Sequence, residues 1–527
     1  MLRLIRGSFA LLAVLLVGLT NAGGSLTIAF VPMYATPVAR QLPLMLGAIA
    51  RIDVREPPRA TLGGYIEPGD VSAVAAWLKS PTLRHAGAFI VSTDMVAYGG
   101  LDPSRVPGGV DTQLALSRLK LFAALRKTRP HAWIAAFGTI MRLEPTAVAP
   151  VGAAASYDPI ARYPLWEYIL EYAKLHTPPQ PDEADRARRL RALIGQPALQ
   201  AYLATRARDR DVDLHILGMA ADHTIDRVVL GQDDAGPVGL HIPDVQALQG
   251  AVARLGIADR ASIEPGADEL GLVLVAHAMA HAAGWTPRVA VRYSMPDGGD
   301  VQDPLEFAPI SSACDALIRL AGAVRNELDP DIILYVRVPN TDGIHDAALL
   351  HELSAETAAG KSVALVDLSF LSGSYEPQAR FVRRLIRAGV AAKLDAYASW
   401  NTNANSTGIA LAEAIAAGVG RRTGRYDPTA HADFMVDRYL DDFLYHDLVR
   451  PRLNDYLTAR GVSDHTYLAP DVWADANRRL RLLLEPLAHD LIAHLYPNYR
   501  VARLSISLPW PRTFEMETDV RLTAKPS

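Results

Sequence analysis

The sequence predicts an α/β protein built on parallel sheets, either barrel-like or as consecutive Rossmann-like domains, followed by an α+β C-terminal region. Between Ser25 and about Gly420, short apolar or β-branched runs alternate with amphipathic helical stretches, a pattern typical of βαβ units. Runs such as residues 332–336 are continuously apolar, as expected for strands covered on both faces. Polar residues follow the ends of several predicted strands, where such sheets carry their chemistry.

The predicted strands are short runs that end in polar or Gly-rich residues. They cover residues 26–31, 88–93, 133–137, 227–230, 262–264, 288–293, 332–338, 362–368 and 394–399. The helices between them are predicted from apolar residues that recur at helical spacing. They cover residues 71–78, 112–126, 165–175, 182–208, 244–255, 270–283, 311–326 and 407–418.

The pattern changes after Gly420. Two long helices are predicted at residues 430–460 and 471–495, and two strands at 501–508 and 514–522 flank a Pro-Trp-Pro turn. We therefore expect a signal peptide followed by an N-terminal α/β domain, a Rossmann-like domain and a helical C-terminal region with short strands. The expected ranges are 1–22, 23–285, 286–425 and 426–527.

The N-terminus has the features of a secretory signal. Arg3 and Arg6 precede an unbroken apolar run at residues 9–19, and Thr20-Asn21-Ala22 offers small residues for cleavage. A retained membrane anchor is the alternative, but the run is shorter than the roughly 20 residues that a span needs. The sequence thus predicts an exported, periplasmic or extracellular protein with no stable membrane span after cleavage.

Charge and motif content narrow the function. The formal net charge is -4 and no long basic run occurs, so nucleic-acid binding is not expected. The single cysteine, Cys314, excludes an internal disulfide and a Cys-based zinc site, and its apolar surroundings predict a buried residue. The sequence has no Walker A motif, no nucleophile elbow and no dinucleotide-binding fingerprint. Carboxylate chemistry without a cofactor is therefore the default enzymatic interpretation.

Asp233 and Asp234 are the predicted catalytic pair. They follow the strand at 227–230, and adjacent carboxylates can divide the work of orienting a group and transferring a proton. Substrate-assisted hexosaminidases use a comparable acidic pair at a strand end, an analogy of arrangement only. The structural alternative is an Asx-turn or a cap for the helix that follows.

Ten further polar or aromatic residues are predicted to bind the substrate because most of them follow strands. Trp400 suits stacking on a sugar ring, and the neighbouring asparagines suit hydrogen bonds to a neutral polyol. Structural alternatives remain open: Asp268 as a helix N-cap, an Arg142–Asp94 ion pair, and asparagine caps. The ten residues are Asp94, Arg105, Arg142, Asp268, Glu269, Asn340, Asp342, Trp400, Asn401 and Asn405.

Several segments together resemble DUF4127, a bacterial family of unknown function, over nearly the whole chain. They are STDMVAYGGL at 92–101 with Ser104 and Arg105, TIMR at 139–142, QDDA at 232–235 with Gly239, PGADE at 265–269, WNT at 400–402 with Asn405 and Gly408, and LPW at 508–510 with RTFE at 512–515. The family commonly ends its first strand in Pro-Leu-Asp-x-Arg-Pro. Here the acidic and basic residues of that segment are replaced in Pro32-Met33-Tyr34-Ala35-Thr36-Pro37. The resemblance implies no established activity.

The leading functional prediction is an exported hydrolase that acts on a glycan or glycoconjugate, or on a smaller molecule, through strand-end carboxylates. One alternative is a metal-dependent enzyme, although no sequence motif predicts a metal site. Its ligands would come from Asp94, Asp233, Asp234, Asp268 and His241. The other alternative is a non-catalytic periplasmic ligand-binding protein with two α/β lobes.

Overall fold

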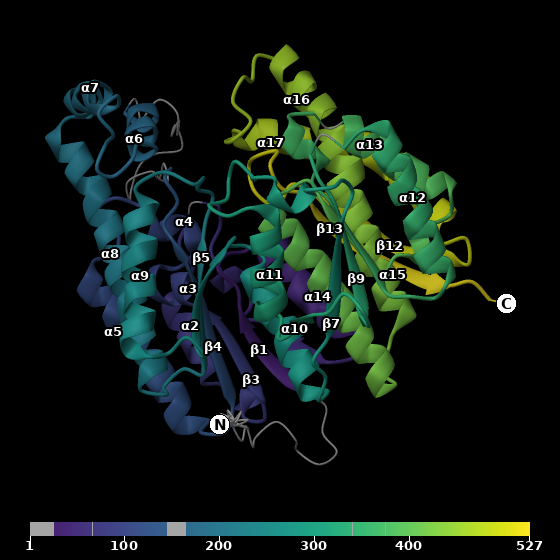
Figure 1. Cartoon of the computed structure of the whole chain (residues 1–527), viewed down its shortest axis with the longest axis horizontal. Coiled ribbons are helices and arrows are strands. Elements are labelled where there is room, and N and C mark those ends of the chain that lie inside the picture. Colours follow the sequence, from purple (N-terminus) through teal and green to yellow (C-terminus); the bar gives the residue numbers. More distant parts are fainter. Residues whose placement is uncertain (1–25, 66, 145–164, 340, 375, 527) are drawn as a thin grey trace, which may run out of the picture.

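The computed structural model describes residues 26–65, 67–144, 165–339, 341–374 and 376–526 (Figure 1). The predicted signal peptide lies outside these ranges. The described chain forms two parallel sheets, covered by helices, and a C-terminal antiparallel hairpin. This confirms the predicted α/β class. Among the described residues, no helix combines the length and apolarity needed to cross a membrane.

The first sheet has six parallel strands in the order β2-β1-β3-β4-β5-β6. In chain order, β2 is added on one side of β1 and β3 on the other side, so the direction in which strands are added reverses at β1. Ligands of such doubly wound sheets bind beyond the carboxyl ends of the strands, near this reversal. The strands are β1 (Thr27–Val31), β2 (Asp53–Arg55), β3 (Ala88–Ser92), β4 (Trp133–Ile140), β5 (Arg227–Gln232) and β6 (Ala261–Pro265).

The second sheet repeats the same order with five parallel strands. From one edge to the other they run β8-β7-β9-β10-β11, so the reversal lies between β7 and β9. In the described chain neither sheet closes on itself; of the two predicted forms, the structure therefore has consecutive open sheets and not a barrel. The strands are β7 (Arg288–Tyr293), β8 (Val324–Arg325), β9 (Ile332–Arg337), β10 (Val363–Asp367) and β11 (Ala396–Ser399).

Helices that pack between the two sheets form a middle layer shared by both (Figure 1). Successive strand residues point to opposite faces. Accordingly Phe30 of β1 and Leu334 of β9 face this middle core, whereas Val31 and Ile333 face outward. The middle helices are α1 (Leu42–Ile49), α10 (Leu270–Ala282), α11 (Ile310–Leu320) and α14 (Asn403–Thr423).

Two outer layers complete the fold. The outer face of the first sheet packs against α2 (Val71–Leu78), α3 (Thr93–Tyr98), α5 (Thr112–Thr128), α8 (Gln196–Ala221) and α9 (His241–Leu255). The outer face of the second sheet packs against α12 (Gly343–Ala358), α13 (Glu376–Arg387), α15 (Pro428–Arg438), a π-helical segment (Tyr439–Val449), α16 (Arg450–Ala459) and α17 (Pro470–Leu495). Short helices α4 (Leu101–Ser104), α6 (Trp166–Ala173) and α7 (Ala184–Ile194) lie at the periphery of the first sheet.

Three helix predictions were wrong in detail. The helix predicted at 311–326 ends at Leu320, because Gly322 adopts a positive φ of 70° and the chain then forms β8. The helix predicted at 182–208 is broken into α7 and α8 at Gly195, where φ is 77°. The helix predicted at 430–460 is interrupted by the π-helical segment.

The C-terminal hairpin, β12 (Tyr499–Ser507) and β13 (Glu517–Ala524), brings its connecting segment back to the first sheet. Trp510 of this segment is buried against the rings of Tyr34 and Tyr65, with centroids 5.6 and 5.4 Å away. Tyr34 directly follows β1. The end of the chain therefore covers one side of the carboxyl edge of the first sheet.

We expect Leu274→Ala to destabilise the protein by about 2–5 kcal/mol, because Leu274 is fully buried in the middle layer and truncation leaves a cavity there. Leu482→Ala is the matched control, since Leu482 is 71% exposed on α17. Urea unfolding followed by circular dichroism measures both. An equal loss of stability in the two variants would show that the middle layer is not part of the hydrophobic core.

Candidate functional site

Seven of the predicted site residues lie together at the carboxyl edge of the first sheet. They are connected by ion pairs or by electrostatic interactions, and we call them the strand-end cluster. Because β3 to β6 are parallel neighbours, the residues that follow them meet at one edge. The cluster consists of Asp94, Arg105, Arg142, Asp233, Asp234, Asp268 and Glu269.

Asp233 and Asp234 are adjacent in sequence but have different cations as partners. Asp233 is buried and accepts a hydrogen bond from the buried guanidinium of Arg105. Asp234 has 44% of its side chain exposed, and its Oδ2 lies 3.5 Å from Nη1 of Arg142. Arg142 also pairs with Glu144 at 3.2 Å. Thus Asp233 belongs to the internal framework, and Asp234 is the member of the pair that reaches solvent.

Arg105 reaches Asp233 because the chain turns sharply after α3. Gly99 and Gly100 adopt φ values of 90° and 139°, a conformation that side chains with a Cβ rarely adopt. This turn starts the short helix α4, after which Arg105 points back toward the sheet edge, 3.9 Å from Oδ1 of Asp102. The Gly-Gly motif therefore serves to place a buried cation.

Asp268 is the carboxylate of the cluster that hydrogen-bonds to Tyr34. The hydroxyl of Tyr34 donates a hydrogen bond of 2.6 Å to its Oδ1. Burial raises the pKa of Asp268 to about 6, helped by the negative charges of Asp234 and Asp102, while the Tyr34 hydrogen bond and Arg105 act in the opposite direction. Asp268 does not cap α10, so the capping alternative for this residue is not realised.

Glu269 is almost completely buried, at 1% exposure. Burial, with a smaller contribution from the charge of Asp268, raises its pKa to about 8, so this carboxyl group is mostly protonated at neutral pH. Gly266 and Gly408 pack directly on its side chain, and a Cβ at either position would collide with it. The two glycines therefore leave just enough room for the carboxyl group.

Asp94 lies deeper, in the first turn of α3. Its Oδ2 accepts a hydrogen bond of 3.4 Å from the Thr139 hydroxyl. Burial, and secondarily the charge of Asp209 on α8, raises its pKa to about 7. Arg142 pairs with Glu144 and Asp234, so the predicted alternative of an Arg142–Asp94 pair is not formed.

Two acidic residues from the second sheet, Asp303 and Glu306, face the strand-end cluster. Both lie in the connection between β7 and α11, and the Ala235 N–H donates a hydrogen bond of 3.0 Å to the Leu305 carbonyl of this loop. Asp303 accepts a hydrogen bond of 2.8 Å from the Asn403 N–H, and Glu306 accepts one from the next N–H of α14. The two carboxylates thus accept hydrogen bonds from the N–H groups at the N-terminus of α14, the helix that follows β11 of the second sheet.

The remaining predicted residues are arranged separately. Trp400 adopts a positive φ of 68°, stacks on His446 and meets Phe514 edge-on. Asn401 accepts a hydrogen bond of 2.8 Å from the Thr402 N–H, and Asn405 lies buried in the first turn of α14, whose cap is Thr402. These residues follow β11 of the second sheet, and Asn405 belongs to α14 itself.

Asp342 belongs to the second sheet alone. It is the N-cap of α12, accepting hydrogen bonds from the N–H groups of Ile344 and His345 at 3.0 and 2.9 Å. It lines a separate pocket, and Asn340 lies outside the described residues. Asp342 therefore lies at the edge of the second sheet and not in the strand-end cluster.

Sequence reasoning missed Tyr34, Asp303 and Glu306. Tyr34 lies in the segment 32–37, where the charged residues of the family pattern are replaced. The sequence therefore drew attention to the missing charges and not to the tyrosine. Asp303 and Glu306 follow β7 by ten residues or more, and applying the strand-end rule to the predicted strand 288–293 would have drawn attention to them.

The metal-ligand set considered from the sequence does not converge. Among the residues described by the structure, no group of three or more His, Cys, Asp or Glu side chains is arranged to hold a metal ion. His241 is fully buried beside Arg206, and burial lowers its pKa to about 4. Cys314 is also fully buried, as predicted, and burial raises the pKa of its thiol to about 12.

We expect Glu269→Gln to stabilise the protein at alkaline pH, by on the order of 2 kcal/mol, and to change its stability little near pH 5. The pKa of Glu269 rises from 4.5 to about 8 on folding, so the folded protein binds more protons between these values. Wild-type stability is fully present below the lower value and falls progressively as the pH rises toward the upper one, a loss that glutamine avoids.

Melting temperatures at about pH 5 and about pH 8.5 measure this difference. Glu167→Gln is the control, because Glu167 is exposed on α6. A stability difference between wild type and Glu269→Gln that is the same at both pH values would contradict the raised pKa.

Comparison with known proteins identifies the family. Neither the curated proteins nor the solved structures contain a significant match to this chain. The family model described as "Protein of unknown function (DUF4127)" matches residues 28–519, which include nearly all of both sheets, β12 and the beginning of β13. The strand-end cluster lies entirely within the matched region. The chain therefore belongs to the DUF4127 family.

Proposed function

We propose that the protein is a hydrolase whose reaction depends on Asp268 and Asp234. The observation that carries the proposal is the contrast between these two neighbouring carboxylates. Asp234 is solvent-accessible and paired with Arg142, whereas the pKa of Asp268 is raised to about 6 and the residue hydrogen-bonds to Tyr34. A carboxyl group with a raised pKa beside an exposed carboxylate held in an ion pair is an arrangement suited to acid–base catalysis.

In this proposal Asp268 transfers the proton and Asp234 stabilises charge. For a glycoside, Asp268 donates its proton to the leaving oxygen as the glycosidic C–O bond breaks, and Asp234 stabilises the positive charge that develops on the sugar. Asp268 then accepts a proton from the water molecule that adds to the sugar. Asp233 positions Arg105, because its carboxylate is already engaged by that guanidinium.

A glycan or glycoconjugate is the proposed substrate class. Tyr34, Arg142 and Asp234 supply hydrogen-bond donors and acceptors within one cluster, which suits a ligand rich in hydroxyl groups. The signal-like N-terminus supports an exported protein, and exported glycans are accessible to such an enzyme.

The first test is a hydrolysis screen of the purified protein against aryl glycosides and cell-wall glycans. We expect turnover of at least one substrate, with Asp234→Asn and Asp268→Asn each reducing kcat by about 100-fold or more. Asp185→Asn is the matched control, because Asp185 is 71% exposed on α7. Absence of turnover on every substrate by folded protein, or release of a bound ligand chemically unchanged, would argue against a hydrolase.

The second test uses the pH profile of the hydrolysed glycoside. As a proton donor, Asp268 must be protonated, so kcat/KM is expected to fall as the pH rises through about 6. The Tyr34 hydrogen bond lowers the pKa of Asp268, and its removal in Tyr34→Phe is therefore expected to move this decline to higher pH.

Phenylalanine retains the aromatic ring that packs on Trp510, so the comparison isolates the hydroxyl group. The titratable and charged groups that interact with Asp268 besides Tyr34 are Asp102, Arg105, Asp234 and Glu269, and all four are unchanged in this variant. A decline that stays at the same pH, or moves to lower pH, would exclude Asp268 as the proton donor.

A further inference from the structure

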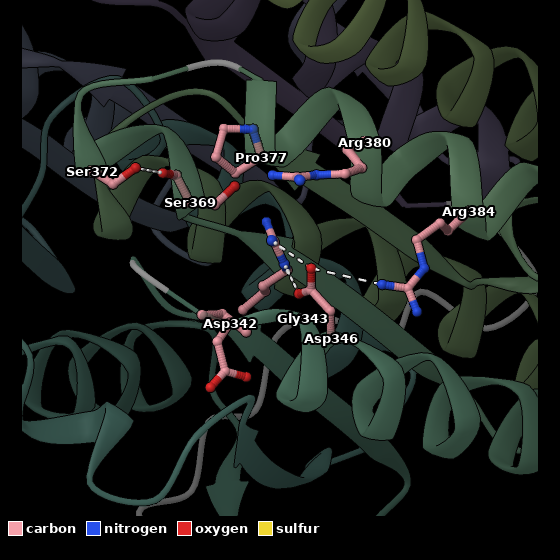
Figure 2. Close-up of a pocket in the computed structure, with 10 residues that line it drawn as sticks. Asp342, Gly343, Asp346, Ser369, Ser372, Pro377, Arg380 and Arg384 are labelled. Carbon is pink, nitrogen blue, oxygen red and sulfur yellow. Dashed lines mark hydrogen bonds and ion pairs between the residues drawn. The ribbon is translucent and has the colours of Figure 1, made fainter.

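A second site lies at the carboxyl edge of the second sheet, away from the strand-end cluster. It is a cavity of about 420 Å³ beyond the ends of β9 and β10, between the beginnings of α12 and α13 (Figure 2). Most of its lining is polar or charged. The lining residues are Arg337, Thr341, Asp342, Gly343, Asp346, Ser369, Ser372, Pro377, Arg380 and Arg384.

The floor of the cavity is a rigid ion-pair network around Arg337. Its guanidinium is 1% exposed and lies over the ring of Phe381. Arg337 donates to both oxygens of Asp346, at 2.7 and 3.1 Å, and to both oxygens of Asp367, at 3.0 and 3.2 Å. One buried cation therefore holds two carboxylates in fixed positions through paired hydrogen bonds to each of them.

Arg380 and Arg384 supply positive charge at the rim. Arg380 pairs with Glu376 at 3.0 Å, but both side chains are more than half exposed, so this pair is weak. Arg384 lies 3.9 Å from Asp346, whose oxygens are already engaged by Arg337. Figure 2 shows Arg380 extending toward Pro377 and Arg384 turning toward Asp346. Both guanidinium groups retain donors for a ligand.

Backbone and hydroxyl donors converge on the same space. Gly343 and Pro377 lie in the first turns of α12 and α13, two helices of 16 and 12 residues, so the positive ends of both helix dipoles border the cavity. Independently, Ser369 is 1% exposed and lines the cavity, yet its Oγ has no hydrogen-bond partner among the residues that the structure describes. A buried hydroxyl without a partner is costly unless a ligand or water satisfies it.

We propose that this cavity binds the anionic group, phosphate or carboxylate, of a small hydroxylated ligand. Arg380, Arg384 and the Ser369 hydroxyl donate hydrogen bonds to the anion. Asp342, whose side chain is 57% exposed while one oxygen caps α12, accepts hydrogen bonds from the ligand's hydroxyl groups. The proposal does not depend on hydrolysis by the strand-end cluster.

Isothermal titration calorimetry on the full-length protein tests this site with glucose 6-phosphate, glucuronate and inorganic phosphate as probes, and with neutral glucose as the reference. We expect at least one sugar anion to bind more tightly than glucose. Arg380→Gln is expected to weaken that binding by about tenfold, because a charge-assisted hydrogen bond is lost. Ser369→Ala is expected to weaken it by a smaller factor, and the phosphate and glucuronate titrations distinguish the two anion types.

Arg387→Gln is the matched control, since Arg387 is exposed near the end of the same helix and does not line the cavity. Within the described part of the chain, Arg380 forms an ion pair only with the exposed Glu376, so its substitution should leave the fold intact, which a melting curve verifies. The proposal is overturned if no anion binds at millimolar concentration, if glucose binds as tightly as the anions, or if Arg380→Gln and Arg387→Gln bind alike.

Discussion

The contact on which the rest of the structure depends is the burial of α14 between the two sheets. Nearly every residue from Asn403 to Gly420 is buried. The first N–H groups of this helix are capped by Asp303 and Glu306, which come from the loop after β7. One turn later Gly408 packs on Glu269 of the first sheet. The same helix therefore fixes the carboxyl edges of both sheets relative to each other.

This packing has an electrostatic consequence. Holding the two edges together concentrates carboxyl groups, and the fold compensates for them in two ways. Asp233 and Asp234 each have an arginine partner, whereas burial raises the pKa of Glu269 and Glu306 so that their neutral forms are favoured. Carboxyl groups that retain a proton near neutral pH are useful to an enzyme, and here they arise from the way the sheets are joined.

Much of the fold was predictable from local pattern, but its assembly was not. The buried strands have strong apolar runs, and all nine predicted strands of the two sheets are present. The edge strands β2 and β8 have three and two residues, too few to produce a pattern. The repeated order with a reversal after the first strand depends on how the helices pack, and this information is not local in sequence.

The same distinction applies to the candidate site. The strand-end rule found Asp94, Asp233 and Asp268, because position relative to a strand is visible in sequence. It could not show that Arg105 would engage Asp233, since that pair spans 128 positions and depends on the turn after α3. Nor could it show that Tyr34 contacts Asp268, 234 positions away. Protonation is decided by such distant contacts and by burial, and it was therefore not predictable.

The two sheet edges arrange arginine and aspartate differently, and this difference bears on their proposed roles. At the second edge, the buried guanidinium of Arg337 holds the carboxylates of Asp346 and Asp367 in place, which creates a rigid floor suited to binding. At the first edge the acids outnumber the cations available to them, and the excess is accommodated by protonation. A group that binds an ion needs a constant charge, whereas a group that transfers protons needs a pKa close to the working pH. The repeated topology thus provides two edges of the same form, and the surplus of carboxyl groups over arginines at the first edge supports the proposal that proton transfer occurs there.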